Sequence, residues 1–294
     1  MNIEWIDTKA IYHQLIQTSD ESERERLYLE RLAAPWSQMM AMASQGDNPL
    51  EGARAWHWVL PDELTRKPSA LVTLEEANAW ERGERAMRKA AQRFVPYADR
   101  IPFDTFTGWL VIANPETSEP IMRGCTGSID WMQPRFVVQY DTPTPRNLRS
   151  LEGMIIHEMN HLVRLRVFPW SMSVSVGDYI IHEGVAESFA AALYGEEVLG
   201  HYVTEFDDSQ LATAKRIIGA GLDETGFDVI RSYIFGDHWA RKLGLPQFGV
   251  PNYGGYAIGY WVVQAYLKQT GRSIEETTFT SAQEIIEASG FFDE

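Results

Sequence analysis

The stretch from residue 151 to 167 reads LEGMIIHEMNHLVRLRV and contains His157, Glu158 and His161 in an HExxH arrangement. On an α-helix, residues four apart lie one turn above each other on one face. Both imidazoles can therefore point at a single ion while Glu158 lies beside it. The apolar residues that flank the motif predict a helix inside the protein. The stretch therefore predicts a helix that carries two metal ligands and an acid–base carboxylate.

A catalytic zinc site takes three protein ligands and keeps one position open, so a third ligand is needed. Glu183 follows His161 with 21 residues between them, in the segment IHEGVAE at 181–187. Capping residues predict that this segment belongs to a second helix, Val176 to Tyr194, which folds back antiparallel to the first. Gly184 within it is expected to let these two helices approach closely around the metal.

Two neighbours of Glu183 have predicted roles. Glu187 lies one turn further along and is predicted to accept a hydrogen bond from the second nitrogen of a ligand histidine, which fixes its tautomer. His182 is the alternative third ligand. A metzincin-like site would need glycine at 164 and histidine at 167, where this chain has Arg164 and Val167. Glu183 is therefore favoured.

The first hundred residues are predicted to be helical. Leucines and charged residues recur at helical spacing over Glu21–Leu32 and Leu74–Phe94. Glycine, asparagine and proline gather between these segments, over Ser44–Pro68, which predicts a connection rich in loops. Residues 1–100 are therefore interpreted as an N-terminal helical region.

From residue 101 the pattern changes. Short β-prone runs at Thr105–Ala113, Ile121–Trp131 and Arg135–Tyr140 predict a small antiparallel sheet beside the HExxH helix. Thr144 before Pro145 predicts the start of that helix, and Pro169 its end. Further helices are predicted over Ser209–Ala220, Asp228–Phe235, Gly255–Gln269 and Ala282–Ala288. The fold class is α+β and mostly helical, with residues 101–294 as the catalytic domain.

Composition argues against several classes of protein. Lys plus Arg number 26 against 41 Asp plus Glu, a net charge of -15 that predicts neither a nucleic-acid partner nor an anionic membrane surface. The single cysteine, Cys125, allows no intrachain disulfide. Residues 1–7 carry acids where a secretory signal carries basic residues, and no apolar run reaches a membrane-spanning length. These features predict a cytoplasmic protein, and they do not specify its oligomeric state.

These motifs resemble those of the gluzincin metallopeptidases. In that group HExxH precedes a helix that reads Asn-Glu-Gly-Phe-Ala, and residues 182–186 read His-Glu-Gly-Val-Ala. The chain also resembles a family of predicted zinc-dependent proteases, catalogued as a domain of unknown function, over roughly residues 101–294. That family combines HExxH, Glu-Gly-x-Ala-Glu and Gly-Tyr-x-x-Gly-Tyr, the last at residues 255–260 here. The resemblance implies a thermolysin-like catalytic core with Glu183 as a zinc ligand.

The resemblance also implies a group that stabilises the transition state. Similar gluzincins place a Tyr-x-x-Gly segment at the start of a later helix, where the tyrosine donates a hydrogen bond to the developing oxyanion. Tyr256 matches this tyrosine. His238, Tyr253 and Tyr260 are the alternative donors.

One stretch departs from the aminopeptidases of this group. They carry a Gly-x-Met-x-Asn strand with an acid that holds the amino terminus of the substrate, whereas residues 124–128 here read Gly-Cys-Thr-Gly-Ser, without an acid. The departure favours endopeptidase or oligopeptidase action. Peptide deformylases combine HExxH with an upstream cysteine ligand, for which Cys125 in this stretch is the candidate. Only half of the deformylase pattern is present, so Cys125 is interpreted as a small buried residue and not as a metal ligand.

The sequence thus predicts a zinc-dependent peptidase with a peptide or protein substrate. His157, His161 and Glu183 would bind Zn²⁺, and Glu158 would take a proton from the attacking water and return it to the leaving amine. A strand of the predicted sheet would pair with an extended substrate. Two alternatives are a zinc amide hydrolase for non-peptide substrates and a zinc-containing regulatory or interaction protein with little turnover. The intact Glu158 argues against the second.

Overall fold

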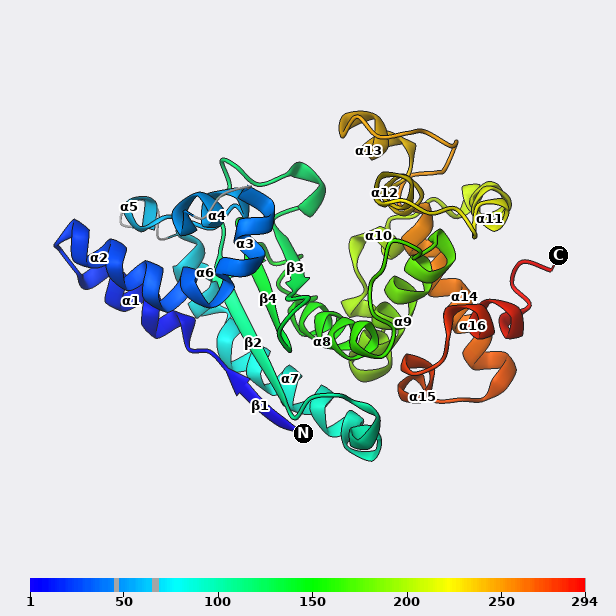
Figure 1. The fold of residues 1–294 in the computed structure, drawn as a ribbon, viewed down its shortest axis with the longest axis horizontal. Helices are drawn as coiled ribbons and strands as arrows, with labels where there is room; N and C mark the ends of the chain where they lie inside the picture. Colours follow the sequence, from blue (N-terminus) through cyan, green and yellow to red (C-terminus); the bar gives the residue numbers. More distant parts are fainter. Residues whose placement is uncertain (45–47, 65–68, 294) are drawn as a thin grey trace. The chain divides into compact units, whose positions relative to one another are not determined.

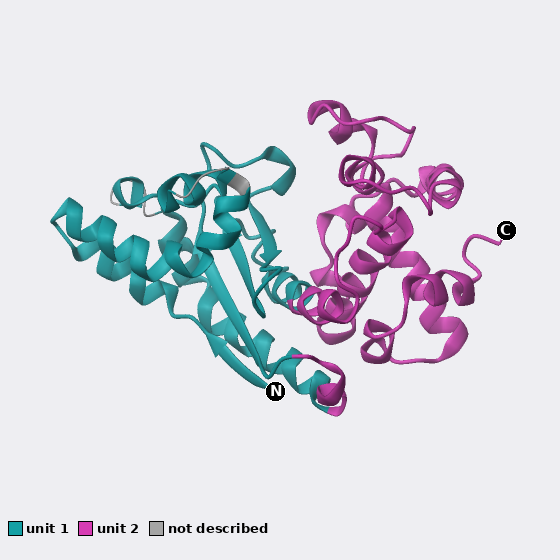
Figure 2. Ribbon diagram, in the orientation of Figure 1, with its two compact units in different colours: residues 1–95, 103–158 teal, residues 96–102, 159–294 magenta. Residues whose placement is uncertain are grey.

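The computed structural model describes residues 1–44, 48–64 and 69–293. The chain divides into two compact units, of which unit 1 comprises residues 1–95 and 103–158, and unit 2 comprises residues 96–102 and 159–294 (Figure 2). The division into residues 1–100 and 101–294 stays a prediction; in the structure, residues 103–158 belong to the same compact unit as the N-terminal helices. Helix α8, Leu151–Val167, is one continuous helix that contributes residues to both units.

The sheet of unit 1 is mixed, which corrects the predicted antiparallel sheet. Its strands are β1 (Asn2–Trp5), β2 (Thr105–Ile112), β3 (Cys125–Ile129) and β4 (Arg135–Tyr140), in the order β1-β2-β4-β3 (Figure 1). Both β1 and β4 run parallel to β2, and β3 alone is antiparallel to its neighbour β4. The prediction failed because β2 pairs with β4 rather than with the next strand in the chain, and because β1 was not predicted.

One face of this sheet packs against α7 (Ala79–Phe94) and the first half of α8. Gly83 of α7 lies close to the sheet and to α8. A β-carbon at this position would stand 2.7 Å from the ring of Trp5 in β1 and 2.8 Å from Ile155 of α8. Gly108 of β2 faces the same way and also lies against Trp5. These contacts pack α7 against both the sheet and the first half of α8.

Tryptophans cover the opposite face. The ring of Trp36 lies edge-on to Trp109 of β2 and to Trp58, at centroid distances of 6.1 and 6.3 Å. Trp36 and Trp58 are buried, and the indole N–H of Trp58 donates to Gln139 Oε1 at 3.0 Å. The sheet therefore has a core on both faces, and these tryptophans act in packing.

Short helices make up the N-terminal part of unit 1. They are α1 (Thr8–Gln17), α2 (Glu21–Tyr28), α3 (Ser37–Ser44), α4 (Pro49–Ala55), α5 (Pro61–Leu64) and α6 (Ser69–Glu76). The predicted helix over Leu74–Phe94 is divided between α6 and α7 because Asn78 takes a left-handed conformation, with φ of 50°. The predicted loop-rich connection contains α4 and α5, and its residues 45–47 and 65–68 lie outside the described part.

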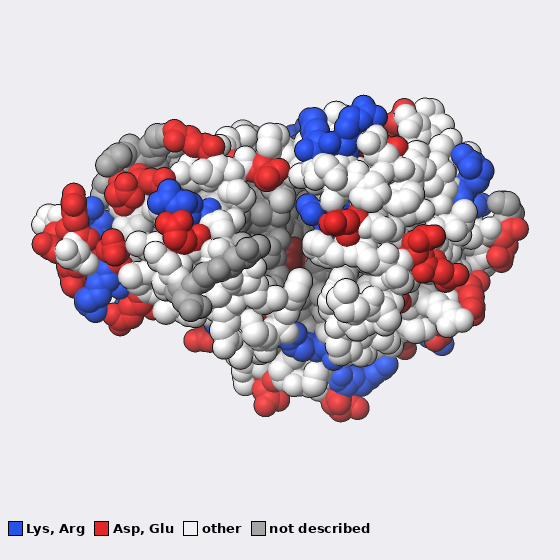
Figure 3. All heavy atoms as spheres, turned by 45° about the horizontal axis from the view of Figure 1, so that its top comes forward, with Lys and Arg blue, Asp and Glu red and all other residues white. Residues whose placement is uncertain are grey.

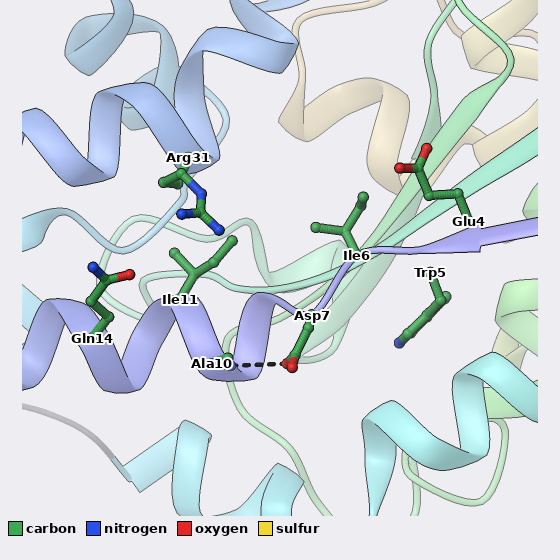
Figure 4. A pocket seen from close by; sticks show the side chains of 8 residues that line it. All are labelled: Glu4, Trp5, Ile6, Asp7, Ala10, Ile11, Gln14 and Arg31. Atoms are coloured by element: carbon green, nitrogen blue, oxygen red, sulfur yellow. Dashed lines mark hydrogen bonds between the residues drawn. The ribbon is translucent and has the colours of Figure 1, made fainter.

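A pocket of about 400 Å³ lies beside β1 and the start of α1 (Figure 4). Its lining residues are Glu4, Trp5, Ile6, Asp7, Ala10, Ile11, Gln14 and Arg31. Asp7 caps α1 there by accepting a hydrogen bond from the N–H of Ala10 at 2.9 Å. None of these residues belongs to the predicted metal site.

Helix α8 begins later than predicted. Thr144 does not start it but closes a turn, in which its hydroxyl accepts from the N–H of Asn147 at 3.2 Å and its own N–H donates to Asn147 Oδ1 at 2.7 Å. The helix then starts at Leu151 and ends at Val167, ahead of Pro169 as predicted. The reason for the late start is that the Asn147 side chain satisfies the backbone of the turn locally.

In the part of unit 2 that the structure describes, the regular elements are helical. They are α9 (Val176–Tyr194), α10 (His201–Thr204), α11 (Leu211–Ala220), α12 (Phe227–Phe235), α13 (Asp237–Lys242), α14 (Gly254–Thr270), α15 (Ile274–Thr278) and α16 (Ala282–Ser289). The bounds of α9 confirm the prediction. Ser175 and Asp178 form a reciprocal capping box at its start, and Gly195 caps its end.

Helices α9 and α14 cross at two glycines in the core of unit 2. A β-carbon on Gly184 would collide with the carbonyl oxygen of Gly259, and one on Gly259 would collide with the carbonyl oxygen of Ile180. The prediction that Gly184 serves the approach to the HExxH helix is therefore corrected: its partner is α14. Because backbone meets backbone here, the crossing fixes how α14 lies on the helix that carries Glu183.

The surface carries charges of both signs. Acidic and basic side chains are interspersed over the face drawn in Figure 3. Within the described residues, every helix is too short or too polar to cross a membrane.

Candidate metal centre

Helices α8 and α9 bring three candidate ligands together: His157, His161 and Glu183. Each offers one nitrogen or oxygen atom, and these atoms lie within 4.8 Å of one another. His161 Nε2 and Glu183 Oε2 are 3.4 Å apart. Two ligands bound at about 2.1 Å in a tetrahedral site are separated by about 3.4 Å, so the spacing of this pair fits a zinc ion.

The helix itself sets the position of His157. Because α8 is continuous, His157 and His161 lie one turn apart on one face. His161 is 9% exposed and Glu183 is 5% exposed. A carboxylate buried beside two imidazoles is costly unless a cation joins them, and two histidines with one glutamate form a donor set of catalytic zinc sites. The residues present therefore fit a zinc ion.

His182, the alternative ligand, is not a member of this group. Burial lowers the pKa of its imidazole well below the usual range, and the charge of Arg164 lowers the pKa further. Its Nδ1 is buried without a hydrogen-bond partner in the described structure. His182 is therefore a neutral core histidine in this fold.

Glu158 lies against the edge strand β3. A β-carbon on Gly127 would collide with the Glu158 carboxylate, which shows that the carboxylate occupies the space where a side chain would stand. Glu158 is 7% exposed. A side chain at position 127 would require this carboxylate to shift.

Hydrogen bonding leaves the backbone of Gly127 directed away from β4. In the β3–β4 hairpin, the N–H of Asp141 donates to the carbonyl oxygen of Gly124 at 3.0 Å. The N–H of Asp130 donates to the carbonyl oxygen of Arg135 at 2.9 Å. Hydrogen-bonded and non-hydrogen-bonded pairs alternate along an antiparallel ladder. Counting from either end, Gly127 falls in a non-hydrogen-bonded pair, so its N–H and C=O point to the open edge of the sheet. Backbone pairing groups and the Glu158 carboxylate are thus adjacent.

Tyr256 stands at the first turn of α14. Burial raises the pKa of its phenol well above the usual range, and the nearby carboxylate of Glu183 raises it further. The group is therefore a protonated donor near a candidate ligand.

The alternative donors are placed differently. The Tyr253 hydroxyl is buried and has no hydrogen-bond partner in the described part of the chain. Tyr260 packs in an apolar cluster with Leu199 and Val203. His238 is exposed, and its ring lies against Trp239 at 5.1 Å.

Glu187 tethers a loop. Its Oε2 accepts a hydrogen bond from the backbone N–H of Gly200 at 3.0 Å, just before α10. Its charge also contributes to the raised pKa of Tyr256 and of Tyr260. The predicted hydrogen bond from a ligand histidine to Glu187 stays a prediction.

Cys125 is buried on β3 and is not part of the metal group. Burial raises the pKa of its thiol to about 12. Metal binding requires a thiolate, so a thiol that resists ionisation agrees with a packing role.

A helix with HExxH and a glutamate from the following helix defines a metal centre of the kind used by zinc-dependent hydrolases. A family model described as "Predicted Zn-dependent protease (DUF2268)" matches residues 79–287, and the chain belongs to this family. The match begins at α7, earlier than residue 101.

The chain is also similar to "Uncharacterized protein YjfC" of Bacillus subtilis (strain 168). The two are 30% identical over 301 residues, which cover 99% of each chain. No solved structure matches the chain significantly, so the thermolysin-like core stays a prediction.

Proposed function

We propose that the protein is a zinc-dependent peptidase that cleaves internal bonds of extended peptide segments. The observation that carries this proposal is the position of Glu158. Its carboxylate lies against Gly127 on an open sheet edge, while His157 beside it belongs to the group of candidate ligands. An acid–base group, one candidate metal ligand and a surface for backbone pairing therefore lie together at one turn of α8.

His157, His161 and Glu183 would hold the ion. When bound, zinc would supply Lewis acidity, which lowers the pKa of a water molecule and polarises a carbonyl group. Glu158 takes the proton of the attacking water and returns it to the leaving amine. Tyr256 donates its hydroxyl hydrogen to the oxygen that becomes negative in the transition state.

The edge of β3 supports recognition of peptide backbone. A substrate strand that pairs there would bond to the outward N–H of Gly127, next to Glu158, and would share the C=O of Gly127 with the Ser128 hydroxyl, which donates to it at 2.8 Å. Strand pairing uses main-chain groups, so it selects for extended conformation more than for sequence. Residues 125–129 carry no charged side chain. The strand thus offers no group to hold a substrate terminus, which supports endopeptidase or oligopeptidase action.

The test of this function is digestion of a peptide library by the purified protein, with metal analysis of the same sample. We expect one zinc per chain and cleavage at internal positions, abolished by a chelator and restored by zinc. Unchanged cleavage after the metal has been removed would contradict the proposal. Hydrolysis of small amides without any peptide cleavage would replace it with the amide hydrolase.

Tyr256→Phe tests the oxyanion donor. The ring is kept and only the hydroxyl is lost, so kcat is expected to fall by roughly 100- to 1000-fold with unchanged zinc content and thermal midpoint. Tyr253→Phe, Tyr260→Phe and His238→Ala are the matched comparisons. Normal turnover of Tyr256→Phe with collapse in one of these three would transfer the role to that residue.

A further inference from the structure

We propose that Tyr202 is a positioning residue that holds the ring of Tyr256 in its working orientation. The inference rests on the proposed function, since it concerns the donor of that reaction. Tyr202 belongs to α10, a helix of one turn that lies more than fifty residues before Tyr256 in the chain. Its role is to support the donor and not to contact the reacting atoms.

Two aromatic rings contact the ring of Tyr256. Tyr202 is stacked on it, with a centroid distance of 4.2 Å and an interplanar angle of 16°. Phe235 of α12 contacts it at 5.9 Å and 50°. These ring contacts restrict the orientation of the Tyr256 ring and so the direction in which its hydroxyl points. The stacked ring of Tyr202 is the closer of the two supports.

The segment that carries Tyr202 is itself tied to the metal-site helix. Gly200, the residue before α10, donates its N–H to Glu187, one turn beyond Glu183 on α9. A β-carbon on Gly200 would stand 3.0 Å from Glu187 Oε1 and 2.8 Å from the ring of Tyr202. Gly200 therefore lies close to both Glu187 and the ring of Tyr202.

Apolar contacts complete the support. Leu199 before Gly200 and Val203 after Tyr202 are both 9% exposed and pack against Tyr260, one turn after Tyr256 on α14. The Tyr202 segment is thus held by α9 through Glu187 and by α14 through Tyr260. The position of the Tyr256 hydroxyl relative to Glu183 follows from these two attachments.

The experiment is a double-mutant cycle on the zinc-loaded full chain. Tyr202→Ala should lower kcat by about 10-fold with little change in KM. Without the stacked ring, the Tyr256 hydroxyl would be correctly oriented in only a fraction of the enzyme molecules. Tyr202→Phe, which keeps the stack, should retain kcat within about twofold. In the Tyr256→Phe background, Tyr202→Ala should change kcat by less than about twofold, since the group it supports is already gone.

Three outcomes would overturn the inference. Normal kcat in Tyr202→Ala would show that the stack is not needed. A loss in Tyr202→Phe as large as that in Tyr202→Ala would assign the effect to the hydroxyl. A further 10-fold loss in the Tyr256→Phe background would show that Tyr202 acts independently. If Tyr202→Ala does not fold, Tyr202→Leu replaces it and Tyr202→Phe remains the reference.

Failure of the proposed function gives a different result. In that case the wild-type protein would cleave no peptide, and the Tyr202 variants would have no activity to compare. If the wild-type protein is active and Tyr256→Phe is impaired, the cycle reports on Tyr202 alone.

Discussion

Glu158→Gln is expected to eliminate nearly all peptide cleavage while metal content and fold are kept. Glutamine has the shape of glutamate and fits the space beside Gly127, but an amide does not shuttle a proton. General acid–base groups contribute roughly 100- to 10,000-fold to rate, so kcat should fall within that range. The measurement is turnover of a peptide identified from the library, alongside zinc analysis and thermal unfolding.

Glu152→Gln is the matched control for this prediction. Glu152 lies on the same helix and forms an ion pair with Arg82, with 2.6 Å between Oε2 and Nη2. Its replacement should lower thermal stability and leave kcat unchanged, the opposite pattern to Glu158→Gln. A Glu158→Gln protein that cleaves at the wild-type rate would rule out the HExxH mechanism for this chain.

Glu183→Ala is expected to abolish stoichiometric zinc binding, and activity with it. Removing one of three candidate ligands leaves His157 and His161, which are too few for a stable site. The loss in zinc affinity should exceed the roughly 10- to 100-fold that removal of an outer partner costs. Titration with a competing chelator measures it, and retention of tight one-to-one zinc would remove Glu183 from the ligand set.

Substitutions of two other residues on α9 serve as comparisons for this result. His182→Ala should keep zinc, because the fold brings Glu183 and not His182 to the two α8 histidines. Glu187→Ala should have an effect smaller than that of Glu183→Ala and larger than that of His182→Ala. We expect a loss of roughly 10- to 100-fold in zinc affinity or in rate. The released N–H of Gly200 would free the segment that supports Tyr256, so this part of the effect should appear in the rate and not in zinc affinity. Loss of zinc in His182→Ala alone would move the ligand by one position.

The crossing of α9 with α14 lies within the part of the chain that the family model matches. The family match spans both helices, and the two glycines at the crossing belong to the segments around Glu183 and Tyr256. Because each glycine lies against the backbone of the other helix, the crossing fixes the distance between the two segments. The motif glycines therefore serve geometry, while the glutamate and the tyrosine carry the proposed chemistry.

Features that depend on residues near one another in the chain could be predicted from the sequence. The spacing of His157 and His161 is a property of any α-helix, so their common face could be predicted before the fold was known. Ser175 and Gly195 marked the ends of α9 because caps are satisfied by residues within a few positions. Glu183 is predicted as a ligand because it is an acid on a helix expected to fold back beside the first, and the structure brings it to His157 and His161.

Contacts between segments that are distant in the chain could not be predicted and are known from the three-dimensional fold. The sheet is mixed because β1 and β4 both join β2, and periodicity along one strand does not specify its partner. Gly127 touches Glu158 because α8 packs on one face of that sheet, and Tyr202 stacks on Tyr256 across more than fifty residues. Contacts of this kind arise from packing the whole chain, so no local pattern in the sequence encodes them.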